Sequence, residues 1–262
     1  MSVTFAQGFS AAGVEAGISS IKGKKDLALV VNDGPLDAAA GVFTANRFCA
    51  APVQWSRKNV ANGRVKAVIL NSGGANACTG QPGYEQAEAT AQKVAELLGA
   101  SAEDVAVCST GLIGELLPLD HVLAGADKAF AALANTAEAG AEASQAIMTT
   151  DTKPKTVELE GSNGFRVGGM VKGSGMIAPQ LATMLCRVYK RAQWPDWTLE
   201  TDAEYTINYS GVPKYADDAQ ISDYAKPSVY FMTKYNVISG VGNGMFAPKN
   251  TNSMEEAEHY AN

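Results

Sequence analysis

The amino-acid sequence predicts a layered α/β domain of the α+β type, followed by a small and mostly helical module. In the first part of the chain, short apolar runs that end at turn-forming residues alternate in blocks with helical patterns, as in a sheet covered by helices. The composition changes near residue 187, because eight of the nine tyrosines lie after that point. We therefore expect one domain over residues 1–186 and a second over residues 187–262.

Five apolar runs predict strands. Three of them, at residues 26–32, 65–71 and 105–108, are rich in Val, Ile and Leu and end at turn-forming residues, which is typical of buried strands. Two further strands are expected later in the chain, at residues 155–160 and 165–171.

Helical periodicity predicts three helices between these strands. The first covers residues 84–98 with one apolar face, and Gly99 is expected to end it. The second is expected to begin with Asp120 as its cap and to carry one apolar side. This side comprises Val122, Leu123, Ala126, Phe130 and Leu133. The third is rich in alanine and is expected at residues 136–148.

The overall composition is that of a globular protein, with 46% hydrophobic and 18% charged residues. The formal net charge of −6 argues against a broad nucleic-acid surface. No apolar run is long enough to span a bilayer, and the N-terminal segment lacks the pattern of a secretory signal. The four cysteines and two histidines form no zinc or disulfide pattern, so we expect no metal, reduced thiols and a cytoplasmic location.

Three turns rich in glycine, serine and threonine follow apolar segments and are the candidate places for chemistry. They are NSGGANACTG from residue 71, STGLIG from residue 109 and MVKGSGMIAPQLATML from residue 170. Successive N–H groups exposed by such a turn can hold an anion or a developing oxyanion. Each segment could equally be no more than a tight turn. The glycine signatures of phosphate-binding and dinucleotide-binding loops do not occur.

Thr183, within the segment LATML, is a candidate nucleophile through its bond to Ala182. A threonine hydroxyl can attack the preceding carbonyl in an N-to-O acyl shift, and hydrolysis of the ester then leaves threonine at a new N-terminus. The freed α-amine has a pKa of about 7.7–8.0 and can act as the base for its own hydroxyl at neutral pH. The alternative from local sequence alone is a half-buried structural threonine.

Four segments in a fixed order resemble the ornithine acetyltransferase (glutamate N-acetyltransferase) family of arginine biosynthesis. They are NSGGANACTG, CSTGLIG, AIMTTD and KGSGMIAP-x-x-ATML, and the resemblance covers residues 5–186. It implies a layered fold of the self-cleaving, N-terminal-nucleophile type. It also implies that the chain cleaves itself between Ala182 and Thr183. Thr183 would then accept the acetyl group of N-acetylornithine and pass it to glutamate.

The same resemblance implies roles for four other residues. Thr110 and Gly111 match the family's oxyanion-stabilising pair, and Thr149 and Lys172 match residues that contact substrate. Lysine suits a substrate carboxylate because its ammonium is a point charge with rotatable donors. Read without the resemblance, the segment Thr149-Thr150-Asp151 could simply cap a helix or turn, Thr110 and Gly111 could form only a turn, and Lys172 could be a solvated surface charge.

The resemblance further implies small-molecule substrates, no cofactor, and no nucleic-acid or membrane partner. Acetyl-coenzyme A stays open as an alternative acetyl donor. In the family, the chain continues after ATML for about the same length again, and that half does not follow here. We therefore expect a heteromer of self-cleaved chains when a complete second half is supplied, and weak or no activity otherwise.

The segment YADDAQISDYAKPSVYFMTKYNVISGVGNGMFAPKN is similar to an S-layer homology module, which attaches surface proteins to cell-wall polymer. Val229 and Met232 fall on one helical face, and a tight loop is expected to anchor Phe246. The glycines of that loop are Gly240, Gly242 and Gly244. The module looks incomplete at its C-terminal end. A non-catalytic protein that binds cell-wall polymer is therefore the alternative function, and an aminopeptidase-like relative with the same nucleophile chemistry is a less favoured one.

Overall fold

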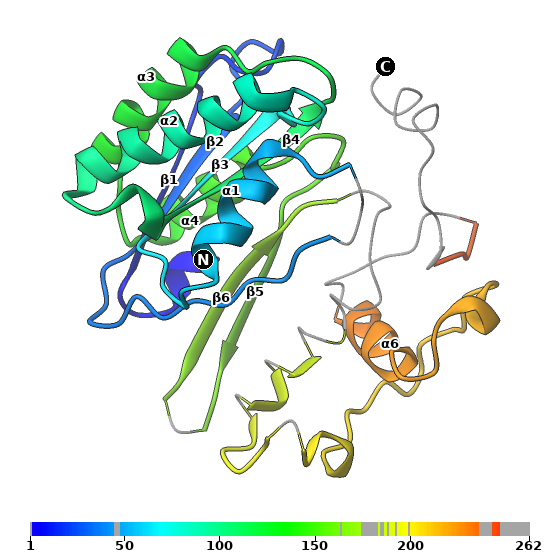
Figure 1. Ribbon diagram of the computed structural model, residues 1–262. Coiled ribbons are helices and arrows are strands. Elements are labelled where there is room, and N and C mark those ends of the chain that lie inside the picture. Colours follow the sequence, from blue (N-terminus) through cyan, green and yellow to red (C-terminus); the bar gives the residue numbers. More distant parts are fainter. Residues whose placement is uncertain are drawn as a thin grey trace. The chain divides into compact units, whose positions relative to one another are not determined.

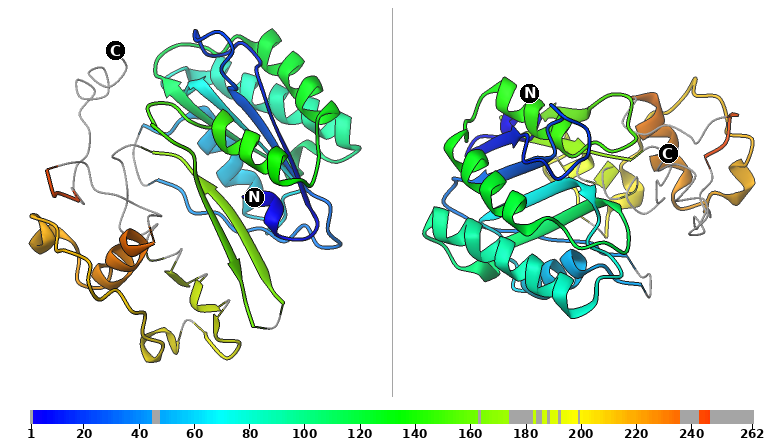
Figure 2. Two further views of the ribbon diagram at one scale, coloured as in Figure 1. Left: turned by 180° about the vertical axis from the view of Figure 1, so that it is seen from behind. Right: turned by 90° about the horizontal axis from the view of Figure 1, so that it is seen from above.

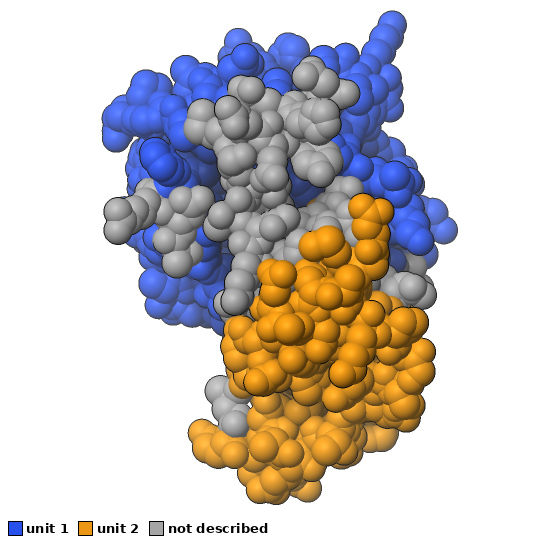
Figure 3. Space-filling view, turned by 90° about the vertical axis from the view of Figure 1, so that its right-hand side faces the viewer, with its two compact units in different colours: residues 1–156, 168–172 blue, residues 157–167, 173–262 orange. Residues whose placement is uncertain are grey.

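The computed structural model describes residues 2–44, 48–162, 164–173, 183, 186–187, 189–191, 193–198, 200–235 and 243–246. The chain divides into two compact units, coloured separately in Figure 3. The first comprises residues 1–156 and 168–172, and the second comprises residues 157–167 and 173–262. The domain boundary between residues 186 and 187 stays a prediction.

Strands and helices alternate along the first unit, as predicted (Figure 1). The strands are β1 (Phe9–Val14), β2 (Leu27–Asn32), β3 (Ala67–Gly74), β4 (Val105–Leu112), β5 (Lys155–Glu160) and β6 (Arg166–Val171). The α-helices of the first unit are α1 (Ala51–Val60), α2 (Gly80–Leu98), α3 (Leu119–Ala131) and α4 (Ala137–Ala146), and the second unit contains α6 (Lys226–Lys234). The short 3-10 helices are η1 (Val3–Phe5), η2 (Ala102–Asp104), η3 (Asp202–Glu204) and η4 (Asp218–Gln220). No helix in the described ranges is long and apolar enough to cross a membrane.

The central sheet has the strand order β1-β2-β3-β4, and β5 pairs with β6 in a separate two-stranded sheet. β1 with β2 and β2 with β3 are antiparallel, whereas β3 and β4 are parallel and are joined through α2. Parallel neighbours place their carboxyl ends at the same edge of the sheet. The turns that follow β3 and β4, both rich in glycine, therefore emerge side by side.

Helices cover both faces of the central sheet, which gives three layers (Figures 1 and 2). The alternation along β2 shows how the sequence specifies the two faces. Leu27 and Leu29 are fully buried in the cluster that contains α1, α2 and α3, while Ala28 is fully buried in the cluster that contains α4. The expected layered α/β fold is confirmed.

The helix ends differ in part from the predictions. Gly99 does end α2, with φ of 63° in the left-handed region. Asp120 does not cap α3, because Pro118 occupies the cap position and Asp120 lies in the first turn, where its charge favours the helix dipole. Phe130 was wrongly placed on the apolar side, since it is 37% exposed. α4 is shorter than residues 136–148, and Thr136 caps it by accepting the N–H of Ala139.

The parallel strands β3 and β4 approach each other very closely at Gly73 and Gly111, which are paired in the register. Gly111 has φ of 138°, and a Cβ atom on it would lie 2.4 Å from the carbonyl carbon of Gly73. Neither the φ angle nor the available space allows a side chain there. Gly73 is similarly restricted, because a Cβ on it would lie 2.9 Å from the backbone nitrogen of Ser19.

A buried carboxylate holds the loop that contains Ser19. The Asp26 side chain, at the entrance to β2, is fully buried and accepts the backbone N–H groups of Ala16, Ile18 and Ser19 at 2.7, 2.7 and 2.8 Å. Three N–H donors offset the cost of burying the charge. Asp26 therefore holds the Ser19 backbone against Gly73.

The second unit is mostly helical, as predicted, and is built around α6. Val229 and Met232 share the buried face of this helix, and Phe246 is buried with them. The backbone N–H of Phe246 donates to Asp217 at 2.8 Å, which fixes the segment that carries this phenylalanine. Gly240 and Gly242 of the predicted loop lie outside the described residues, whereas Gly244 has φ of 72°.

Replacement of Gly111 with alanine is expected to destabilise the central sheet by about 3 kcal/mol, because the added Cβ collides with the backbone of β3. Gly114→Ala is the matched control. Gly114 also has a positive φ, of 90°, but a Cβ there meets nothing within 4 Å, so only about 1–2 kcal/mol is expected. Urea denaturation combined with amide exchange of β3 and β4 measures both values. Equal losses in the two variants would contradict the close approach.

Candidate functional site

Three of the predicted site residues meet in the first unit. Thr110 lies near the end of β4, Thr149 follows α4, and Lys172 follows β6 directly. The Nζ atom of Lys172 donates to Oγ1 of Thr110 at 2.8 Å and to Oγ1 of Thr149 at 2.9 Å. These contacts span 62 and 23 residues of sequence, so the fold brings together groups that the chain keeps apart. We refer to these three residues as the Lys172 cluster.

The Lys172 ammonium is half-buried and is not a freely solvated surface charge. Burial lowers the pKa of Lys172, and the positive charges of Lys155 and Lys24 lower it further, while the negative charge of Asp151 raises it. A hydroxyl has one donor and two acceptor positions. Because Thr110 and Thr149 accept from the ammonium, their own hydroxyl protons stay available for an anion, and the ammonium strengthens them as donors.

Asp151 contacts this cluster through the backbone of Thr149, and only 1% of its side chain is exposed. Its Oδ1 atom accepts from Nζ of Lys155 at 2.5 Å, and its Oδ2 atom accepts the backbone N–H of Thr149 at 3.3 Å. A single carboxylate thus anchors the start of β5 and the backbone of one threonine of the cluster. From the sequence, this residue, which closes the segment AIMTTD, was assigned only the alternative of capping a helix or turn and no role at the site.

The turn that begins at Thr110 is held against the turn that follows β3. The N–H of Ala75 donates to the carbonyl of Leu112 at 2.8 Å, and the N–H of Gly114 donates to the carbonyl of Ala77 at 2.9 Å. Gly111 directly precedes these contacts, lies next to Thr110 and is exposed. Two of the three predicted turns therefore form one structure. The third turn, from residue 174 onward, lies largely outside the described residues.

Asn76, in the first of these turns, was missed by sequence reasoning. It has φ of 47° and is fully buried, with its Nδ2 atom donating to the carbonyl of Gly83 at 2.8 Å. Its Oδ1 atom accepts from the Thr79 hydroxyl at 2.7 Å. Cys78 also has a positive φ, of 58°. Left-handed residues other than glycine cost about 1–2 kcal/mol and gather at functional turns, so the surrounding hydrogen bonds must hold this conformation.

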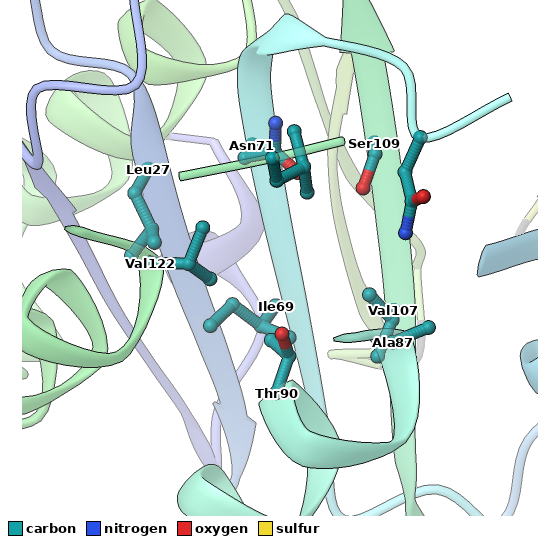
Figure 4. A pocket seen from close by; sticks show the side chains of 10 residues that line it. Leu27, Ile69, Asn71, Ala87, Thr90, Val107, Ser109 and Val122 are labelled. Carbon is teal, nitrogen blue, oxygen red and sulfur yellow. The ribbon is translucent and has the colours of Figure 1, made fainter. Parts of the chain in front are cut away.

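Beneath these turns lies a small cavity of about 10 Å³ between the sheet and α2 (Figure 4). Apolar side chains line most of it, together with the polar side chains of Asn71, Asn76, Thr90 and Ser109. The Oγ atom of Ser109 is buried and has no hydrogen-bond partner among the described residues. A space of this size holds about one water molecule. A substrate with an amino-acid backbone is far larger than one water molecule and cannot bind there. The cavity is therefore not the substrate site.

The predicted nucleophile Thr183 belongs to the second unit and is buried, with 9% exposure. Its predicted cleavage partner Ala182 lies outside the described residues. Thr110, Gly111, Thr149 and Lys172 all belong to the first unit. The roles of these residues stay predictions, whereas the hydrogen bonds of the Lys172 cluster are features of the fold.

Two family models match the chain. The ArgJ family matches residues 10–210, and the S-layer homology domain matches residues 214–251. An arginine biosynthesis bifunctional protein ArgJ from Bifidobacterium longum is 82% identical over 186 residues, which cover 71% of this chain and 48% of the relative. Its counterpart from Thermobifida fusca is 56% identical over 185 residues and is covered to 47%. The chain thus spans about half the length of these curated relatives.

Solved structures agree with these matches. An ornithine acetyltransferase from Mycobacterium tuberculosis, complexed with ornithine, has a TM-score of 0.66 and 52% identity, and covers 68% of this chain and 94% of the matched chain. An ArgJ protein from Bacillus halodurans has a TM-score of 0.61 and 38% sequence identity to this chain. That match covers 68% of this chain and 92% of the Bacillus halodurans chain. With most of its length matched by the family model, the chain belongs to the ArgJ family.

Proposed function

We propose that the chain transfers the acetyl group of N-acetylornithine to glutamate through an acetyl-threonine intermediate on Thr183. The observation that carries this proposal is the Lys172 cluster, in which one ammonium holds two hydroxyls at 2.8 and 2.9 Å. Such a cluster suits a substrate that carries a carboxylate and passes through an oxyanion. The names of the relatives, which include arginine biosynthesis proteins and an ornithine acetyltransferase, support the choice of substrates.

The nucleophile is generated first. The Thr183 hydroxyl attacks the carbonyl carbon of Ala182, the peptide C–N bond breaks, and an ester forms between the two residues. Water then hydrolyses this ester, which leaves a carboxylate on Ala182 and a free α-amine on Thr183. That amine is uncharged in part at neutral pH and can take the proton of the Thr183 hydroxyl.

Acetyl transfer then follows in two steps. The Thr183 oxygen attacks the acetyl carbonyl of N-acetylornithine, the amide C–N bond breaks, and the leaving amine takes the proton held by the α-amine. The amine of glutamate next attacks the acetyl ester, the ester C–O bond breaks to release N-acetylglutamate, and a proton of the glutamate amine passes through the Thr183 α-amine to the Thr183 oxygen. Each step passes through a tetrahedral oxyanion, which we assign to the Thr110 hydroxyl and the Gly111 N–H.

We assign Lys172 and Thr149 to substrate binding. A protonated Lys172 offers charge to a substrate carboxylate, while its contact with Thr110 polarises the hydroxyl that faces the oxyanion. Since burial lowers the pKa of Lys172, this contribution is lost at a lower pH than it would be for an ordinary lysine with a pKa of 10.5. No cofactor takes part in the scheme, acetyl-coenzyme A stays open as a second acetyl donor, and the cytoplasmic location stays a prediction.

We also propose that the activity needs a companion polypeptide. The matched region covers about half of each curated relative, so the remainder of the family chain would supply further contacts around the acetyl acceptor. The active form would then be a heteromer of self-cleaved chains. The C-terminal half of the Bifidobacterium longum relative is a suitable companion, because that relative is 82% identical over the matched region.

Mass spectrometry of the purified chain, alone and with this companion, tests the nucleophile. We expect fragments of residues 1–182 and 183–262 from the natural sequence and from Thr183→Ser, which keeps a hydroxyl. Thr183→Ala removes the attacking oxygen and is expected to give one uncut chain with no acetyl transfer to glutamate. Cleavage or turnover that persists in Thr183→Ala would contradict the mechanism.

Replacement of Thr110 with valine keeps the shape of the side chain and removes its hydroxyl. Loss of one oxyanion donor lowers kcat by about 10²–10³-fold, so we expect a loss of this size with little change in KM. Thr150→Val is the matched control, because Thr150 is exposed and adjoins the cluster without joining it. The acetyl-transfer assay with the companion measures both variants. A kcat of natural size in Thr110→Val would exclude this oxyanion role.

The S-layer homology match at residues 214–251 favours a second candidate function, which is binding to cell-wall polymer. Sedimentation of the full chain with purified cell walls tests this function. Cell walls from which the attached polymer has been removed are the control. If this function holds, the chain is expected to sediment with intact walls and to stay in solution with stripped ones. Equal sedimentation with both preparations, or none with either, would exclude polymer binding.

A further inference from the structure

We propose that Asp151 is a positioning residue for the Lys172 cluster, and that Lys155 occupies the Asp151 carboxylate so that Lys172 stays directed at Thr110 and Thr149. The inference deepens the proposed function, because it concerns how the substrate-binding lysine is held. It assigns the two neighbouring lysines different tasks. Lys155 neutralises the buried carboxylate, and Lys172 keeps its charge for a ligand.

The contacts of Asp151 support the positioning role. Its side chain is almost fully buried and reaches two segments at once, with Oδ1 bound to Nζ of Lys155 at 2.5 Å and Oδ2 accepting the N–H of Thr149 at 3.3 Å. The Thr149 hydroxyl in turn accepts from Lys172 at 2.9 Å. The carboxylate therefore acts on Lys172 through the backbone of Thr149 and through its charge.

The distribution of charge explains why Lys155 is needed. The charged groups that act on Lys172 are Asp151, Lys155 at the start of β5, and Lys24 in the loop before β2. A carboxylate carries a full negative charge, whereas a hydroxyl offers an ammonium only a dipole, so the carboxylate attracts the ammonium more strongly. An unoccupied Asp151 would therefore draw the Lys172 ammonium away from the two hydroxyls. The ion pair with Lys155 removes this competition.

The side-chain titration of Lys172 tests the inference in the full chain. Lysine labelled with ¹³C at Cε allows the pKa of Lys172 to be followed by NMR, with the resonance assigned from Lys172→Arg. Asp151→Asn removes an attractive charge and is expected to shift the pKa of Lys172 downward, whereas Lys155→Met removes a repulsive charge together with the ion pair to Asp151 and is expected to shift it upward. Lys153→Met, which changes an exposed lysine, is the matched control and is expected to leave it unchanged.

Charge alone would also give opposite shifts in these two variants. The double variant Asp151→Asn/Lys155→Met therefore decides: if Asp151 draws Lys172 once Lys155 is gone, the upward shift caused by Lys155→Met is expected to be much smaller in the Asp151→Asn background, and an equal shift in both backgrounds would overturn the inference. Shifts in the same direction, or no shift in either, would overturn the inference. If Asp151→Asn does not fold, the Lys155→Met variant, which keeps Asp151, still tests the inference. An unchanged or lowered pKa of Lys172 in Lys155→Met would contradict it. The titration needs no turnover, so opposite shifts in a chain that transfers no acetyl group would count against the proposed function only.

Discussion

The close approach of Gly73 and Gly111 is the constraint on which the arrangement of the first unit depends. Parallel pairing brings the carboxyl ends of β3 and β4 to one edge of the sheet, and the two glycines let the backbones meet there without intervening side chains. Asp26 also stabilises this region, because its buried carboxylate holds the Ser19 backbone against Gly73. The Thr110 hydroxyl therefore stands on a closely packed part of the sheet, which suits the oxyanion role that we propose for it.

The Lys172 cluster joins this part of the sheet to the rest of the unit by electrostatics. A half-buried ammonium loses hydration, and it regains part of that energy from two hydroxyls and from the nearby Asp151 carboxylate. Because both hydroxyls are neutral, they solvate the positive charge of the Lys172 ammonium but do not neutralise it. A cationic site that stays uncancelled in a partly dry setting attracts anions more strongly than a solvated surface lysine does.

Much of this fold was readable from the sequence, and so was the membership of the Lys172 cluster. Val- and Leu-rich runs predicted β2, β3 and β4, and a family resemblance singled out the three residues that the fold brings together. β1 was missed because the centre of FSAAGV consists of the small residues Ser, Ala, Ala and Gly, and α1 was missed because buried polar residues such as Ser56 obscure its apolar face. The roles of Asn76 and Asp151 depend on partners brought close by folding, which local patterns do not encode.

The chain combines a region of the ArgJ family with a segment that matches the S-layer homology domain. The central claim concerns the first of these: that its cluster supports acetyl transfer through Thr183. The most direct measurement is peptide mapping of the chain, with its companion, after incubation with N-acetylornithine. Our account predicts an acetyl group on the peptide that begins with Thr183, and its removal when glutamate is added. An unmodified Thr183 peptide, or an acetyl group that glutamate does not remove, would contradict it.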